Sequence, residues 1–276
     1  MKRNKFFIIK FSLTALCLTT AANVACAQEV EARRQPSLED ARAVLVRLAE
    51  LSRKQELRTE AAQNLLTGEM LKTKANSFGK LTEAPDKILL TEKNRAVGRF
   101  QMSGAHERAV DVYFYLEYDK SWKIYASRAT ALAGIFEQSY SFMKNRTDLS
   151  ETEKLDFANL KLTLAPDRDL RVWFSENRQK LDELRALLQK TGGKTSTVYV
   201  GWDEKQFPEA FRMLRKLNLR TAIVKPNGDV EIVIGGISDN TVGFLYSPSN
   251  KPPAISPDSY IWVEKVAEKW FLFRTT

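Results

Sequence analysis

Cysteine and histidine are scarce in this sequence, and where they lie narrows the chemistry open to it. Its 276 residues include two cysteines and one histidine. Cys17 and Cys26 both lie within residues 1–27, so a chain that loses this segment contains no thiol. Such a chain cannot form a disulfide, a cysteine nucleophile or a cysteine–metal site. A single imidazole does not make an ordinary zinc site either.

Long apolar runs are also absent. No stretch reaches the roughly 18 apolar residues that a membrane-spanning helix needs, so we expect no transmembrane segment. A shorter apolar run at residues 11–22 follows a basic start and precedes Ala25-Cys26-Ala27. The two alanines stand where a signal peptidase reads small residues. We therefore expect a signal peptide over residues 1–27, export to the periplasm or beyond, and Gln28 as the first mature residue.

Cys26 has a second interpretation. In bacterial lipoproteins, a cysteine that follows a short box of apolar and small residues becomes the lipidated first residue. Here the box would be residues 23–26, with Asn23 at a position where an aliphatic residue is usual. An acyl anchor at Cys26 would tether the protein to a membrane, whereas cleavage after Ala27 would release it. We prefer cleavage, and the lipid anchor stays an open alternative.

The excess of positive charge is small once the leader is set aside. The whole chain has 43 Lys and Arg residues against 34 Asp and Glu residues, a formal net charge of +9. Four of the basic residues and none of the acidic ones lie within residues 1–27, which leaves 39 against 34 and a net charge of +5. This is an ordinary value, and we expect no nucleic-acid partner.

Recognisable catalytic and cofactor motifs are missing. His106 stands in a stretch typical of a loop, and no G-x-S-x-G elbow accompanies it. No calcium loop, Walker loop or dinucleotide fingerprint is present, so we expect no cofactor and no metal. Carboxylates remain as the only catalytic groups, which keeps a carboxylate-dependent hydrolase of envelope polymers as an alternative. The carboxylates in or beside predicted strands are Asp111, Glu117, Asp119, Asp239 and Glu264.

The spacing of apolar residues divides the chain into helical and extended parts. Residues 37–80 and 127–190 have a helical period, whereas residues 88–126 and 197–276 alternate as strands do. We therefore expect an α+β fold, with a helix-rich N-terminal region around an antiparallel sheet and a C-terminal antiparallel β-meander that carries one helix.

The same pattern predicts two domains that meet near residues 192–196. The first, over residues 28–192, would hold a helix pair, a β-hairpin sheet and three helices, and the second, over residues 193–276, an antiparallel β domain with one helix. Ser37 and Ser150, each followed by an acid three residues later, predict two of the helix starts, and Asp167 predicts a third.

Favourable side-chain pairs across neighbouring strands predict two hairpins. The first, at residues 107–126, turns at Asp119-Lys120-Ser121, and the second joins residues 260–266 to residues 269–275. A slip of one residue would spoil the favourable pairs, so the register is well specified. The expected pairs are Tyr118 with Trp122, Leu116 with Ile124, Tyr115 with Tyr125, Glu117 with Lys123 and Val263 with Phe273.

The first hairpin also places three tyrosines on one face. Tyr113, Tyr115 and Tyr125 lie opposite the face of Phe114 and Leu116. A row of tyrosines on a sheet can receive a flat or extended ligand. The alternative is that helices of the same domain cover them. These tyrosines are our candidate ligand-binding residues.

The strand Trp122-Lys123-Ile124, which follows paired N-terminal helices and a hairpin, resembles the nuclear-transport-factor-like (cystatin-like roll) domains. A W-x-I strand often ends the curved sheet of that family, and the sheet wraps a helix and leaves a pocket. The resemblance covers at most residues 38–126. It implies a cone-shaped α+β domain, and because that fold serves enzymes, binding modules and interaction domains, it implies no single activity.

We therefore expect an exported, non-catalytic protein of the cell envelope that binds a small ligand or another envelope protein. The expectation rests on an export signal joined to a chain almost free of catalytic side chains. The hydrolase named above is one alternative, and a lipid-anchored structural protein, which depends on Cys26, is the other.

Overall fold

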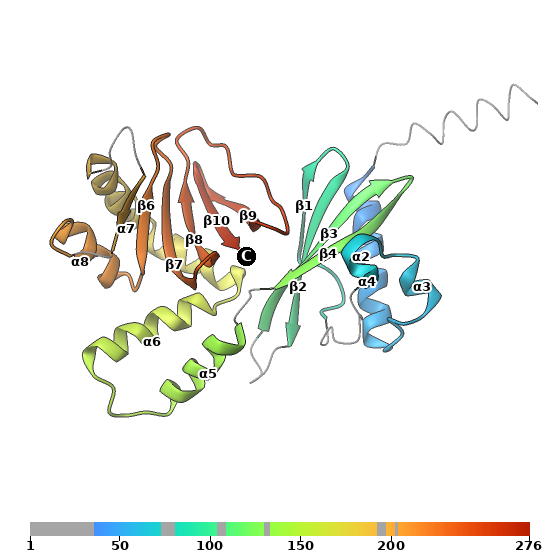
Figure 1. The fold of residues 1–276 in the computed structure, drawn as a ribbon, viewed down its shortest axis with the longest axis horizontal. Coiled ribbons are helices and arrows are strands. Elements are labelled where there is room, and N and C mark those ends of the chain that lie inside the picture. The colour runs from blue at the N-terminus through green and yellow to red at the C-terminus, as the bar shows by residue number, and fades with distance from the viewer. Residues whose placement is uncertain (1–35, 73–80, 104–108, 130–132, 192–196, 202–203) are drawn as a thin grey trace, which may run out of the picture.

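The computed structural model describes residues 36–72, 81–103, 109–129, 133–191, 197–201 and 204–276. Two antiparallel sheets dominate them, and Figure 1 shows the sheets next to each other, with the N-terminal helices on the outer side of their sheet and the other helices beside, below and behind the C-terminal sheet. This confirms the predicted α+β fold. The expected signal peptide, Cys26 and His106 lie outside the described residues.

The N-terminal half builds a four-stranded antiparallel sheet in the order β1-β2-β3-β4. Its elements are α2 (Leu38–Arg53), α3 (Glu60–Gln63), α4 (Gly68–Lys72), β1 (Lys87–Glu92), β2 (Arg95–Ser103), β3 (Ala109–Asp119) and β4 (Ser121–Ala129). Helix α2 starts as predicted, because Ser37 accepts a hydrogen bond from the Asp40 N–H. A Cβ on Gly98 would lie 2.2 Å from Leu45 Cδ1. Glycine at this position therefore lets α2 pack directly on the sheet.

The second helix of the predicted pair is interrupted. The Ile124 N–H donates to the Leu65 carbonyl at 2.8 Å, and the Thr67 N–H donates to the Ile124 carbonyl at 2.9 Å. Strand β4 is the edge of its sheet, and its free backbone groups find these partners in the chain between α3 and α4. The helical repeat of apolar residues therefore yields two short helices and a bridge.

The β3–β4 hairpin has the predicted register at three of its four pairs. These are Tyr118 with Trp122, Leu116 with Ile124 and Glu117 with Lys123. Tyr115 instead lies opposite Ala126, because the register shifts between Tyr115 and Leu116. The rings of Tyr115 and Tyr125 still approach to 6.1 Å between centroids. In the second hairpin, the predicted pair Val263 with Phe273 is confirmed.

The C-terminal half builds a six-stranded antiparallel sheet in the order β5-β6-β7-β8-β10-β9. Its helices are α5 (Ala133–Lys144), α6 (Glu151–Thr163), α7 (Asp167–Thr191) and α8 (Pro208–Lys216). Its strands are β5 (Val198–Val200), β6 (Thr221–Val224), β7 (Val230–Ile237), β8 (Asn240–Tyr246), β9 (Tyr260–Ala267) and β10 (Trp270–Thr275). Ser150 and Glu153 form the predicted capping box of α6.

Helices α6 and α7 pack on the C-terminal sheet, although the apolar pattern predicts that they belong to the first domain. Leu170, Phe174 and Leu184 of α7 share one core with Ile232 and Phe244 of the sheet. One face of the N-terminal sheet is covered by α2, and the other packs against Ile261 and Trp262 of β9. The α6 and α7 helices therefore contribute to the core of the C-terminal sheet, and the predicted domain bounds stay a prediction. Independent folding of the two parts stays a prediction.

Candidate functional site

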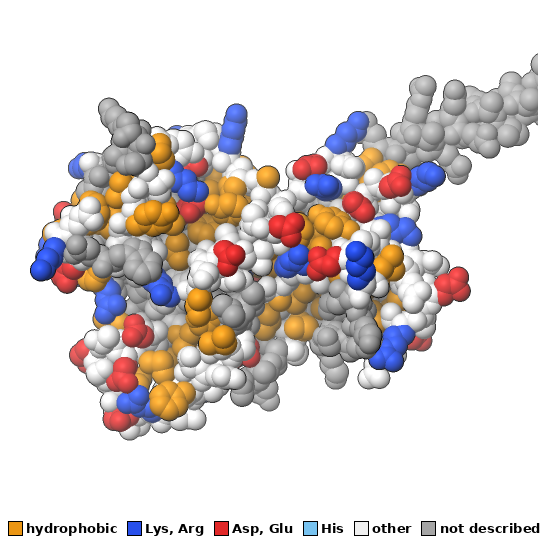
Figure 2. All heavy atoms as spheres, viewed as in Figure 1, with side chains coloured by type: hydrophobic (Ala, Val, Ile, Leu, Met, Phe, Trp, Pro, Cys, Tyr) orange, Lys and Arg blue, Asp and Glu red, His pale blue; other side chains and the backbone are white. Residues whose placement is uncertain are grey.

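A groove of about 600 Å³ lies between the α5–α6 hairpin and α8. This volume is within the range of small-molecule sites, roughly 300–1,000 Å³. Figure 2 shows apolar side chains over the hairpin and Lys and Arg side chains beside α8. Its lining includes Phe136, Ser139, Met143, Leu155, Asp156, Asn159, Phe211, Arg215 and Arg220.

Helix α5 forms the outer wall of the groove. Phe136, Ser139 and Met143 follow one another at helical spacing and line it together. Tyr140, next to them on the wheel, packs on Phe157 of α6 with 5.4 Å between ring centroids and so holds the hairpin together. On the other side of this stripe, the apolar side chain of Phe142 is 69% exposed. The apolar face of α5 is therefore wider than its contact with α6.

Asn159 of α6 connects the base of the groove to the sheet. Its Nδ2 donates to the Asn218 carbonyl at 2.7 Å and to the Ile234 carbonyl at 2.5 Å. Because both neighbours are acceptors, the amide nitrogen must face them. Asn159 Oδ1 then has no donor among the described residues, so it is available to accept a hydrogen bond from a ligand.

Helix α6 approaches β7 closely beside this asparagine. Thr163 is buried, and its hydroxyl donates to the Asn159 carbonyl at 3.0 Å. A Cβ on Gly235 would lie 2.1 Å from Thr163 Oγ1, so this close approach requires glycine. The inner wall of the groove is thus held in place by packing as well as by hydrogen bonds.

Two arginines stand on the α8 side of the groove. Arg220 is exposed and donates to the Gly236 carbonyl at 2.8 Å. Arg215 is half-buried, and no hydrogen bond or ion pair connects its side chain to any residue that the structure describes. Arg212, on the same helix but outside the groove, is exposed and donates to the Pro208 carbonyl at 3.2 Å.

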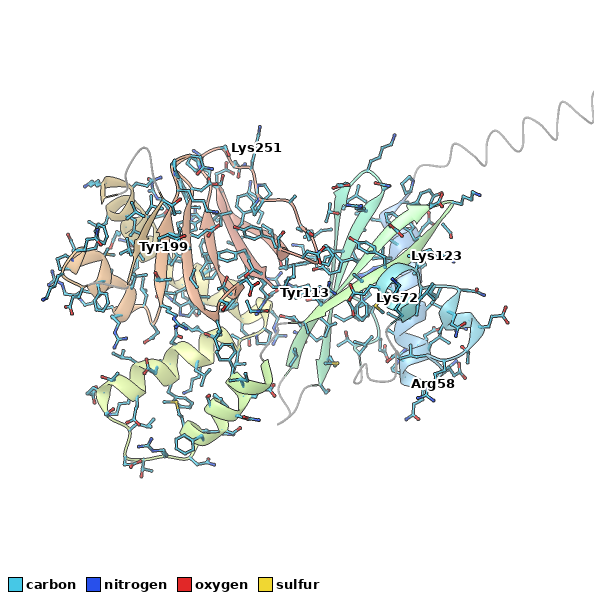
Figure 3. All side chains as sticks on the ribbon, viewed as in Figure 1. Arg58, Lys72, Tyr113, Lys123, Tyr199 and Lys251 are labelled. Atoms are coloured by element: carbon cyan, nitrogen blue, oxygen red, sulfur yellow. The ribbon has the colours of Figure 1, made fainter. Side chains whose placement is uncertain are left out.

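The three candidate tyrosines lie at the junction of the two sheets. Tyr113 is fully buried, and Figure 3 shows it between the sheets. Its hydroxyl donates to Asp167 Oδ2 at 2.9 Å, and its ring lies 5.2 Å from that of Trp262. The Tyr115 hydroxyl donates to the Ile261 carbonyl at 2.6 Å, and Tyr125 is half-buried beside it. Strand β9 thus covers this face, and binding of a ligand there stays a prediction.

A buried network of charges surrounds Tyr113. Asp167 accepts hydrogen bonds from Arg99 Nη1 at 2.8 Å and from Arg274 Nε at 2.7 Å. Glu264 accepts a hydrogen bond from Arg99 at 3.0 Å. Two cations at the rim also donate to Glu264, Lys87 at 2.6 Å and Arg171 at 2.5 Å. We call these residues, together with Asp86, Asp111 and Tyr113, the junction network.

The cations of the junction network keep two of its buried acids ionised. Burial alone would raise the pKa of Asp167, but Arg274 and Arg99 outweigh burial and lower it. Burial likewise opposes ionisation of Glu264, and hydrogen bonding to Lys87 together with the charge of Arg99 lowers its pKa. Both acids are thus committed to partners within the chain.

Asp111 differs from the other acids of the junction network. Burial, and next the negative charge of Asp167, raise its pKa to about 6. Its Oδ2 accepts a hydrogen bond from the Asp167 N–H at 2.7 Å, while Oδ1 has no partner among the described residues. Asp111 therefore caps α7, which corrects the prediction that Asp167 does so. The side chain of Asp167 is occupied by the two arginines and Tyr113.

The candidate catalytic carboxylates separate in the structure. Asp111 and Glu264 join the junction network, whereas Glu117 and Asp119 stay in the β3–β4 hairpin and Asp239 lies in the turn before β8. None of the five lines the groove. Within the described segments, no group of three or more Asp, Glu, His or Cys residues is arranged to hold a metal ion.

Sequence reasoning missed the groove. The one sign of the groove in the sequence is that the apolar face of α5 is wider than a contact with a single helix requires. Nothing in the sequence distinguishes Arg215 from its neighbours. None of the helices in the described part of the chain has the length and apolarity to cross a bilayer.

Comparison of this chain with protein-family models, with curated proteins and with solved structures found no match. We therefore argue its function from the geometry of the site.

Proposed function

We propose that this chain is an exported, non-catalytic binding protein that holds a small ligand with an apolar body in the groove between the α5–α6 hairpin and α8. The observation that carries the proposal is the lining itself. Phe136, Met143, Leu155 and Phe211 are half-buried and form apolar walls, while a few polar groups, such as Asn159 Oδ1, stand among them with free hydrogen-bonding capacity. Apolar walls with a few convergent polar groups are typical of ligand sites.

The distribution of carboxylates favours binding over hydrolysis. A glycosidase needs two carboxylates that face each other across a cleft. Asp156 is the one carboxylate among the described lining residues of the groove. The acids that do converge, Asp167 and Glu264, are buried and bound to cations. We therefore place the hydrolase second.

Export to the periplasm or beyond is part of the proposal and rests on the leader at residues 1–27. Mass spectrometry of the mature N-terminus tests it. A free Gln28 supports the exported protein, and an acylated Cys26 supports the lipid-anchored alternative. An intact Met1 in material recovered from cells contradicts both.

Filling the groove tests ligand binding without removing a core side chain. Ser139 is exposed and lines the groove, whereas Gln138, the preceding residue of α5, is exposed but does not line it. With the neutral fluorescent probe Nile red, we expect Ser139→Trp to weaken binding by about tenfold or more, because an indole occupies the volume that the probe needs. Gln138→Trp should stay within about twofold of the parent protein. Equal binding by the parent and both variants, or no binding by the parent, would contradict the proposal.

A further inference from the structure

Arg215 stands apart from the other arginines of the described segments. Those arginines each have at least one hydrogen bond, ion pair or other polar or ring interaction with the rest of the chain. The side chain of Arg215 has none with a described residue, although it is half-buried in the lining of the groove. A cation that is partly shielded from water and has no counter-charge in the described chain can take a ligand anion as its partner.

The position of Arg215 in α8 does not by itself explain this arrangement. Arg215 and Lys216 lie in the last turn of α8, where cations favour the helix dipole. Lys216 is exposed and supplies that charge from the solvent side. The dipole therefore accounts for basic residues in this turn, but not for a guanidinium in the groove.

We infer that the ligand of the groove is a small amphiphile with an anionic head, and that Arg215 binds this head while the apolar walls receive its body. The inference rests on the proposed function and names the ligand class. A guanidinium presents several N–H donors to the oxygens of a carboxylate or phosphate. Arg220 adds a second positive charge on the same side. Asp156 opposes them but is exposed to water, which screens it.

Carboxylate and phosphate heads share this chemistry, so the test uses a series of ten-carbon probes. Decanoate, decyl phosphate, decanol and decyltrimethylammonium are titrated below their micelle-forming concentrations, and inorganic phosphate is titrated alone. We expect the parent protein to bind the anionic probes about tenfold or more tightly than the neutral and cationic ones, as a charge-assisted hydrogen bond would give. The order of decanoate and decyl phosphate then identifies the preferred head.

Two arginines of one helix provide matched variants. Arg215→Ala should remove the preference for anionic probes, Arg215→Lys should restore part of it, and Arg212→Ala, which removes the same charge outside the groove, should stay within about twofold of the parent. Equal affinity for decanol and decanoate overturns the inference while the proposed function stands. Inorganic phosphate binding as tightly as decyl phosphate would also overturn it, because the apolar walls would then play no part. Failure of every ten-carbon probe to bind the parent removes the proposed function together with the inference.

Discussion

The junction between the sheets and the groove beside α8 use arginine in opposite ways. Arg99, 1% exposed, has carboxylates of Asp86, Asp167 and Glu264 around its guanidinium and lies 5.0 Å from the ring centroid of Trp262. Arg215, half-buried, has no such partner in the described chain. A cation whose partners all come from its own chain holds the fold together. A cation that lines a groove and has no partner in its own chain is available to a ligand.

The energetic consequence also differs between the two regions. Burial of charges at the junction is costly, and the mutual contacts of the network offset the cost only while every partner is present. Loss of one partner there leaves another charge buried and unpaired. Loss of Arg215 leaves no charge behind. The two regions should therefore respond very differently to substitution.

The largest effect is expected at Asp167, which joins Arg99 of one half to Arg274 of the other. We predict that Asp167→Asn lowers the free energy of unfolding by about 3–5 kcal/mol, because two buried guanidinium groups lose their shared anion. Urea unfolding measures this change. Asp169→Asn is the matched control, since Asp169 lies in the same turn but, among the described residues, its side chain pairs only with exposed Arg168. A surface pair is worth about 1 kcal/mol or less. Similar losses for both variants would show that the network does not hold the halves together.

An intermediate effect is expected from the titration of Asp111. Its pKa of about 6 lies above the ordinary value of 3.8, so the folded chain keeps this proton at pH values where the unfolded chain has lost it. The stability that Asp111 contributes is therefore fully present below about pH 4 and is lost as the pH rises through 6. Asp167 and Glu264, whose pKa values are lowered, act in the opposite sense and lose their contribution only under more acidic conditions.

Asp111→Asn isolates this contribution. The amide cannot titrate, but its oxygen can still accept the hydrogen bond from the Asp167 N–H. Between pH 5 and pH 7.5 we expect the parent to lose on the order of 1 kcal/mol of unfolding free energy relative to the variant. His106 is present in both proteins and cancels in the difference. A difference that does not change with pH would mean that Asp111 is not held protonated by the junction.

The pairing of residues close in sequence was predictable. The structure departs from the predicted pairing where the backbone is irregular. The match of Glu117 with Lys123 and of Leu116 with Ile124 specifies the β3–β4 hairpin, since both pairs are close in sequence. The shifted partner of Tyr115 was not predictable, because alternation carries no sign of a bulge. The break between α3 and α4 was not predictable either, because it depends on hydrogen bonds to the edge strand β4.

The junction and the groove were beyond sequence reasoning for a different reason. Arg99 and Glu264 are 165 residues apart, and no spacing rule relates charges at that distance. The tyrosine row gave a correct face, but not the strand that covers it. The groove depends on how far α5 stands from α8, which is a matter of tertiary packing. For the candidate site residues, the sequence could therefore identify which face of the sheet they occupy, but not which residues contact them.

The smallest effect is expected for Arg215 in the absence of a ligand. Arg215→Ala should change the free energy of unfolding by less than about 0.5 kcal/mol, as is usual for positions without internal partners. With decanoate or decyl phosphate at about 100 times its Kd, the parent should gain about 2.7 kcal/mol. A variant with tenfold weaker binding should gain about 1.4 kcal/mol less. The contribution of Arg215 would thus arise only with the ligand bound, whereas that of Asp167 is present in the free chain. A large loss of stability from Arg215→Ala without ligand would place this arginine with those of the junction.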